Sequence, residues 1–252
     1  MINFVISNII KFYSKFSTSY ENFFLKSNQH YKNDLTVKGY YYDKIENDTT
    51  NHINLNLKKI TINKYINKYI LEKKQIVDLL DHIFVKNRIS NKITNLTGFK
   101  YSIDYFIFYE TFHIKSSDQY KGWYANHWHF DKPYSENTLK LIMPMDIIDD
   151  HHGPIEIINI SNSKNLFFNR LADFKLTGRC NEYLLFMSNQ CLHRAGNPNP
   201  GLVRKQIMFQ LNPAREWSVS NKIDILQKYR EPKFPLFYNR KKIKINKFIS
   251  GY

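Results

Sequence analysis

Three side chains of types that bind transition metals are His129, Asp131 and His193. In an extended chain alternate side chains point to the same side, so His129 and Asp131 can reach one ion while Phe130 points away. Two imidazoles and one carboxylate form the facial ligand set of mononuclear non-haem iron(II) centres, which leaves neighbouring coordination positions open for a cosubstrate and dioxygen. The sequence therefore predicts a metal site made of these three residues.

An arginine follows this candidate site at an interval that suits the next strand. Arg204 lies shortly after His193 and just before the alternating segment 206–211. Its planar guanidinium is suited to bind a carboxylate through paired, charge-assisted hydrogen bonds. We therefore expect Arg204 to bind the carboxylate of a small molecule that shares the site with the metal.

These residues, together with the turn and strand at 153–158, resemble the phytanoyl-CoA dioxygenase family of Fe(II)/2-oxoglutarate oxygenases in order and spacing. The resemblance covers about residues 100 to 212. It implies that His129, Asp131 and His193 are the catalytic ligands of Fe(II), which also binds dioxygen. It further implies that Arg204 binds the far carboxylate of the cosubstrate 2-oxoglutarate. The expected reaction is hydroxylation of an unactivated C–H bond in a small-molecule, lipid or glycan-precursor substrate, and the basic composition is compatible with an anionic one.

The chain departs from the family pattern in two places. Many members carry a Ser or Thr two residues after the remote histidine, where this chain has Ala195. The family sequence Pro-Gly-Ser-His that follows the central strand reads Asn-Ile-Ser-Asn at 159–162. Arg204 is therefore left as the main charge for the cosubstrate. Asp131 argues against the halogenase branch, in which a small residue replaces the carboxylate.

His127 leaves alternatives open. His127 and His129 are also a same-face pair of the kind that cupin metal sites use, but Glu136 is the only candidate for the glutamate that such a site needs. We interpret His127 as a neighbour of the ligands or a substrate-facing residue, and His151 and His152 as exposed turn residues. One alternative function is a cupin-like metalloenzyme that does not use 2-oxoglutarate. The other is a non-catalytic β-sandwich that binds an anionic polymer through its basic surface.

The elements that must position these residues are mostly strands. Short extended candidates at 105–109, 139–148, 154–160, 183–187 and 203–211 are separated by turn residues, which favours a sandwich or barrel. The resemblance implies a mainly β double-stranded β-helix, the cupin-like jelly roll, with flanking helices. Helices are predicted at 75–85, with His82 at its surface or boundary, and over the first 20 residues, where Tyr13 and Phe16 belong to the apolar face formed with Val5, Ile6, Ile9 and Ile10.

We expect three parts along the chain: an N-terminal helical arm and linker (1–34), the dioxygenase domain with a helical N-terminal part and a jelly-roll core (35–215), and a basic, irregular C-terminal tail (216–252). The net charge of +15 comes mostly from scattered lysines without a nucleic-acid-binding motif, so specific nucleic-acid binding is not expected. Cys180 and Cys191 form no Cys-x-x-Cys arrangement and are expected to be free thiols. Without a signal peptide or a transmembrane segment, the predicted location is cytoplasmic; the oligomeric state is left open.

Overall fold

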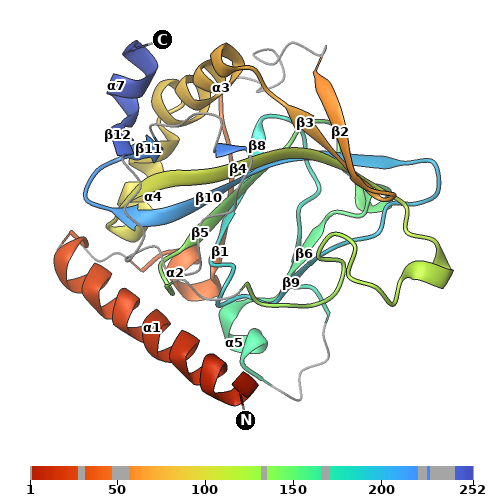
Figure 1. Ribbon diagram of the computed structural model, residues 1–252, viewed down its shortest axis with the longest axis horizontal. Coiled ribbons are helices and arrows are strands. Elements are labelled where there is room, and N and C mark those ends of the chain that lie inside the picture. The colour runs from red at the N-terminus through yellow and green to blue at the C-terminus, as the bar shows by residue number, and fades with distance from the viewer. Residues whose placement is uncertain are drawn as a thin grey trace.

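The computed structural model of the chain describes residues 2–27, 32–46, 57–131, 135–165, 171–220, 226–227 and 242–251, and of residues 2–11 the backbone alone. Its centre is a nine-stranded sheet that lies beside a three-stranded one (Figure 1). The strands are β1 (Tyr40–Lys44), β2 (Lys58–Asn63), β3 (Ile66–Ile70), β4 (Lys100–Phe112), β5 (Leu139–Pro144), β6 (Ile155–Ile157), β7 (Phe174–Lys175), β8 (Glu182–Phe186), β9 (His193–Ala195), β10 (Val203–Ala214), β11 (Ser218–Ser220) and β12 (Lys242–Lys244).

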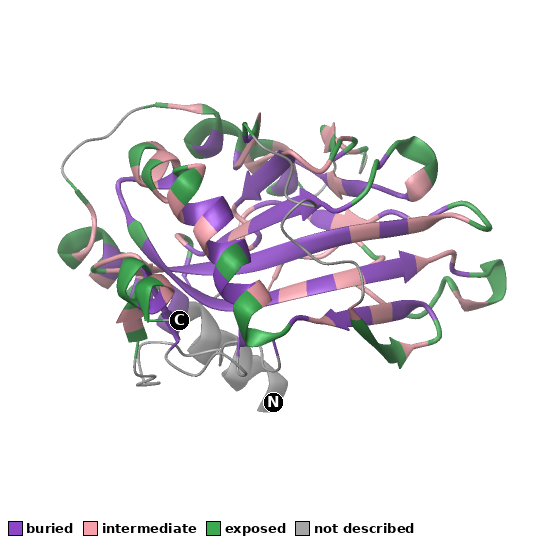
Figure 2. Cartoon of the chain, turned by 90° about the horizontal axis from the view of Figure 1, so that it is seen from above, coloured by how far each residue is buried: buried purple, intermediate pink, exposed green. Residues whose placement is uncertain are grey.

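The large sheet is built around β10, which pairs antiparallel with β4 on one side and β5 on the other. The order continues through β8 to β1 at one edge, and β3, β11 and then β12 extend the β4 side. Ile207 of β10, for example, pairs with Phe108 of β4 and Met143 of β5. Aromatic and branched residues favour this pleated, buried environment, and the long strands are buried over most of their length (Figure 2).

The two faces of the large sheet are covered differently. Ile207, Phe209 and Leu211 of β10 point into the main core, whereas Met208 belongs to a second cluster on the side of the small sheet. The main core is closed by helices α3 (Lys73–Leu80), α4 (Ile89–Thr97) and α7 (Ile245–Ser250), with a π-helical turn η2 (Asp81–Lys86) continuing α3. The shorter helices are α2 (Asp34–Lys38) and α5 (Ile160–Ser163). The inner face of β10 is left for the site.

The small sheet has the order β7-β6-β9. An isolated bridge extends it beyond β9, because His129 and His193 exchange backbone N–H···O hydrogen bonds of 3.1 and 3.0 Å. The strands β4, β10, β5 and β8 therefore face a second layer formed by His129, β9, β6 and β7. This arrangement is the jelly roll that the resemblance implied.

Two local predictions were wrong. The helix at 75–85 is present as α3 and η2, but His82 is buried at 2% exposure rather than at the surface, and the Asn87 amide lies 3.3 Å from its Nε2. The tail after residue 215 is not irregular throughout, because β11, β12 and α7 bring Val219 and Phe248 into the main core. Residues 221–225, 228–241 and 252 of the tail lie outside the described residues. The domain boundaries stay predictions.

Helix α1 (Ile2–Phe24) packs through an unexpected face. Tyr13 is buried as predicted, but Phe16 is 51% exposed, and the side chains turned toward the domain include Ser17 and Glu21. The predicted apolar positions at 5, 6, 9 and 10 lie outside the described side chains. Glu21 accepts hydrogen bonds from Ser135 Oγ (2.5 Å) and Asn137 Nδ2 (3.0 Å). Polar contacts therefore dock α1 against the segment 135–137. None of the described helices is long and apolar enough to cross a membrane.

Candidate metal centre

The fold brings His129, Asp131 and His193 together at the inner face of the small sheet. Asp131 Oδ1 lies 3.9 Å from His129 Nε2 and 4.0 Å from His193 Nε2, and one potential ligand atom of each residue lies within 4.8 Å of the other two. Neighbouring ligand atoms bound about 2.0 to 2.2 Å from one ion are roughly 3 Å apart, so a shift of about an ångström in these side chains would bring all three onto one ion. Among the described residues this is the only such group of histidine, cysteine and carboxylate side chains.

Backbone carbonyls orient both imidazoles. His129 Nδ1 lies 2.8 Å from the carbonyl oxygen of His127, and His193 Nδ1 lies 3.0 Å from that of Cys191. These contacts assign the proton to Nδ1 and leave the Nε2 lone pair for a metal, as in most histidine-metal sites. His193 Nε2 is buried without a hydrogen-bond partner in the described part of the chain. Burial lowers the pKa of His193 to about 3, so its ring is neutral at physiological pH and ready to bind a cation.

Asp131 is held as a carboxylate by Lys140. Burial alone would raise the pKa of Asp131, but Lys140 and the neighbouring His193 hold it well below its ordinary value. The Lys140 ammonium lies 2.5 Å from Oδ2, while Oδ1 is the oxygen near the two imidazoles. The ion pair therefore engages one carboxylate oxygen and leaves the other for a metal.

Arg204 is fully buried near the start of β10 on the face that the cavity lines. Its Nη1 donates hydrogen bonds to the carbonyls of Gly153 and, at 3.2 Å, Gly196, and its guanidinium lies 5.7 Å from the centre of the Tyr124 ring. Nε and Nη2 have no hydrogen-bond partner among the described residues. An unsatisfied buried cation costs free energy, so a carboxylate ligand would stabilise this arrangement.

Glycine at position 153 is required for this support of Arg204. Gly153 has φ +61°, and a Cβ atom there would lie 2.5 Å from the carbonyl carbon of Asn197 and 2.5 Å from the nitrogen of Pro198. Only glycine lets the two turns approach so closely. The turn that the sequence placed at 153–158 thus positions a carbonyl for the guanidinium, which spacing alone did not reveal.

A cavity of about 1040 Å³ contains the three candidate ligands and has the size of a small-molecule site. Trp123, Tyr124 and His127 line it. His127 does not belong to the candidate ligand group, so the cupin-type pair is not formed in the described residues. The Arg194 guanidinium lies over the ring of Trp128, 4.7 Å from the ring centre. The predicted turn at 151–152 is a 3-10 helix, η4 (Asp150–His152), capped by Asp149.

Sequence reasoning missed several residues that line this cavity. Lys140, Lys68, Gln206 and Gln210 all line it from strands of the large sheet. Each is one member of an alternating strand, but many other lysines and amides occupy similar positions in the chain. The pairing of β3, β4, β10 and β5 brings these four side chains to the same cavity.

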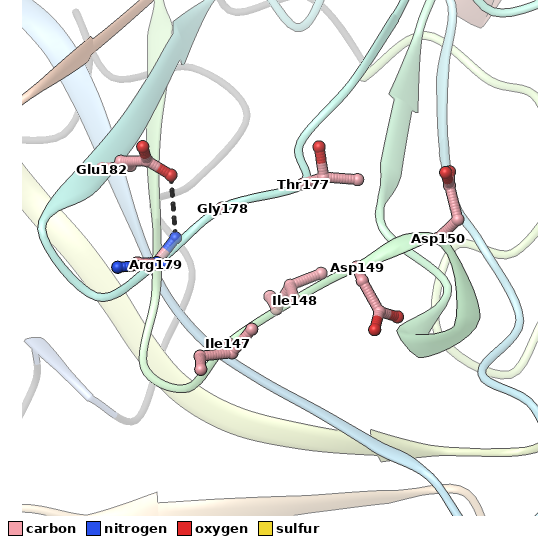
Figure 3. Close-up of a pocket in the computed structure, with 8 residues that line it drawn as sticks. All are labelled: Ile147, Ile148, Asp149, Asp150, Thr177, Gly178, Arg179 and Glu182. Atoms are coloured by element: carbon pink, nitrogen blue, oxygen red, sulfur yellow. Dashed lines mark hydrogen bonds between the residues drawn. The ribbon is translucent and has the colours of Figure 1, made fainter.

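A second hollow, of about 400 Å³, lies between the segments 147–150 and 177–182 (Figure 3). One of its carboxylates, that of Glu182, already accepts a hydrogen bond from the Arg179 backbone N–H at 2.8 Å and pairs with Lys44 at 3.0 Å. No candidate metal-ligand group occurs there among the described residues. The large cavity is therefore the better candidate for chemistry.

Comparison with known proteins supports the fold. No protein-family model matches the sequence, and no curated protein does either. Among solved structures, the chain is similar to the non-haem α-ketoglutarate-dependent epimerase SnoN from nogalamycin biosynthesis, with a TM-score of 0.53, 10% identity, and coverage of 71% of this chain and 80% of that one. EctD from S. alaskensis, solved with 2-oxoglutarate and 5-hydroxyectoine, gives a TM-score of 0.51 at 14% identity, covering 74% and 79%. These similarities confirm the double-stranded β-helix fold.

Proposed function

We propose that the protein is an Fe(II)- and 2-oxoglutarate-dependent dioxygenase that hydroxylates a C–H bond of a small molecule, and that it is related to the phytanoyl-CoA dioxygenase family. The observation that carries this proposal is the placement of two kinds of unsatisfied group on the inner side of one jelly roll. A neutral, buried imidazole nitrogen of His193 belongs to a His-Asp-His set, and two buried guanidinium nitrogens of Arg204 have no partner among the described residues. The first suits a metal and the second suits a carboxylate.

Each residue then has a defined task. His129, Asp131 and His193 would hold Fe(II), and Arg204 would bind the far carboxylate of 2-oxoglutarate. When bound, iron, dioxygen and 2-oxoglutarate supply the oxidising chemistry. Lys140 keeps Asp131 ionised and fixes its orientation through Oδ2. The cavity wall shields the reacting carbon from bulk water.

The two alternatives fit the structure less well. A cupin-like centre would need His127 among the ligands, and a non-catalytic polymer-binding protein would give no reason for a buried arginine with unsatisfied N–H groups. Cys180 and Cys191 are free thiols, which is compatible with the reducing cytoplasm that we propose as the location.

The test is an anaerobic titration of the purified protein with Fe(II) and then 2-oxoglutarate, followed by visible absorption. We expect the metal-to-ligand charge-transfer band of the chelate in the wild type, its loss in Asp131→Ala, and a requirement for much more 2-oxoglutarate in Arg204→Lys. Lys205→Ala, a change at the next position of the same strand, is the matched control and should give the wild-type band.

Each other result has a defined meaning. Iron binding without the band would favour the cupin alternative. A folded protein that takes up no iron would favour the polymer-binding alternative, and a full-strength band in Asp131→Ala would contradict the proposed ligand set.

A further inference from the structure

A second cation faces the large cavity from its rim strand. Lys68 lies on β3, and Ile66, which shares its side of the strand, also lines the cavity. The alternate residues Asn67 and Tyr69 point the other way and donate hydrogen bonds to Glu110. Lys68 is only 8% exposed, so most of the residue is removed from solvent.

Lys68 has no acidic partner within the described part of the chain. Lys140, which also lines the cavity, does have one, because it contacts Asp131 at 2.5 Å. On the opposite side of the sheet, Lys59 of β2 contacts Glu110 at 2.9 Å. Burial lowers the pKa of Lys68, and no carboxylate of the described residues offsets this effect. A buried ammonium without a counter-charge destabilises the folded protein, and a bound anion would remove that cost.

The chemistry of the surrounding wall favours an anion with an apolar body. Among the described residues that line the cavity, Asp131 is the only carboxylate, and Lys140 already neutralises it. Gln210 Nε2 is a further buried donor without a partner among the described residues. The remaining lining is largely apolar or aromatic and includes Ile62, Ile66, Ile107, Ile142, Trp123 and Phe186.

The strand register separates Lys68 from the metal centre. Lys68 pairs with Tyr109 of β4, which pairs with Gln206 of β10, whereas Lys140, the partner of Asp131, pairs with Gln210. Three strand spacings and four residues then separate the two lysines, or roughly 20 Å between their Cα atoms along the sheet. An anion held by Lys68 therefore lies at a different end of the cavity from the candidate ligands.

We propose that Lys68 binds the carboxylate or phosphate of an amphipathic organic acid, and that this acid is the substrate whose apolar body extends toward the metal. The assignment of this acid as the substrate rests on the proposed function, but the anion site at Lys68 does not depend on it. It assigns a substrate class: organic anions whose charged group is remote from the carbon that is oxidised.

The probe is sodium octanoate, with octanol as its uncharged counterpart, titrated into the metal-free protein by calorimetry and by quenching of tryptophan fluorescence. We expect the wild type to prefer octanoate. Lys68→Met should weaken octanoate binding roughly tenfold or more, as for loss of a charge-assisted hydrogen bond, and leave octanol binding unchanged. Lys68→Arg should restore most of the preference. Lys58→Met, an exposed lysine of the adjacent strand β2, is the matched control and should behave as wild type.

An equal affinity of the wild type for octanoate and octanol would overturn the inference, and so would an unchanged preference in Lys68→Met. The 2-oxoglutarate titration of Lys68→Met tests whether the anion that Lys68 binds is the cosubstrate. If Lys68→Met weakens the 2-oxoglutarate charge-transfer complex as much as Arg204→Lys does, Lys68 serves the cosubstrate and the substrate assignment is wrong. If the wild type shows no charge-transfer band but keeps the octanoate preference, the proposed function fails while the anion site stands.

Discussion

The contact between α1 and the domain gives a quantitative prediction, because it buries a carboxyl group. Glu21 is only 5% exposed. Burial raises its pKa from 4.5 to about 7, although the hydrogen bonds from Ser135 and Asn137 act in the opposite direction. The folded protein therefore binds the Glu21 proton more tightly than the unfolded chain does. The stability that this proton provides is fully present below pH 4.5 and is lost as the pH rises to about 7.

The size of this loss follows from the two pKa values. Their difference of 2.5, taken from 4.5 and about 7, corresponds to roughly 3 kcal/mol at about 1.36 kcal/mol per pKa unit. Glu21→Gln removes the ionisation and keeps the shape of the side chain. We therefore expect the variant to be more stable than the wild type by about 3 kcal/mol at pH 8 and nearly equal to it at pH 4.5.

Urea unfolding at the two pH values measures this difference directly, since the variant and the wild type share every other titrating group. Glu136→Gln, at an exposed position beside the same contact, is the control and should show no pH-dependent gain. A Glu21→Gln variant that is no more stable than the wild type at pH 8, or equally stabilised at both pH values, would refute the reasoning.

Three further predictions concern the site. Gly153→Ala should lower the free energy of unfolding, measured with urea, by more than about 3 kcal/mol, because backbone strain of about 1 to 3 kcal/mol adds to the steric clash. The control is Gly201→Ala, where φ is +83° and nothing lies within 4 Å of the added Cβ, so this variant should show the backbone strain alone. Lys140→Met should weaken Co(II) binding roughly tenfold or more between pH 7 and pH 5, beyond the change in wild type, because burial raises the pKa of Asp131 and the largest effect that opposes it is then removed. Equal pH dependence in the two proteins would contradict this. His127→Ala should leave Co(II) affinity at pH 7 unchanged in the same titration, and a large loss would instead indicate a cupin-type centre.

The convergence of the candidate ligands was predictable because the alternation of side chains along a strand is a local property. His129 and Asp131 share a side in any extended segment, and the interval from His193 to Arg204 suits a return along the next strand. Their convergence in the structure agrees with that reasoning, although their roles stay proposals.

The residues that reasoning from the sequence missed depend on which strands become neighbours. Lys68 and Lys140 face one cavity only because β4 and β10 lie between their strands in a particular register. The buried face of α1 was missed for a related reason. Its orientation is set by hydrogen bonds from residues more than a hundred positions away, and these offset the free-energy cost of leaving the Phe16 ring exposed.

The reciprocal backbone hydrogen bonds between His129 and His193 have a consequence for how a metal would enter. These hydrogen bonds use backbone groups alone and need no ion, so little conformational entropy would remain to be lost when a metal binds. Small zinc domains differ, because their chains are ordered by the ion itself. Here a chelator should leave the jelly roll folded, and ions of similar size should exchange within one ready-made scaffold. The identity of the bound metal would then follow from the supply in the cell as much as from the protein.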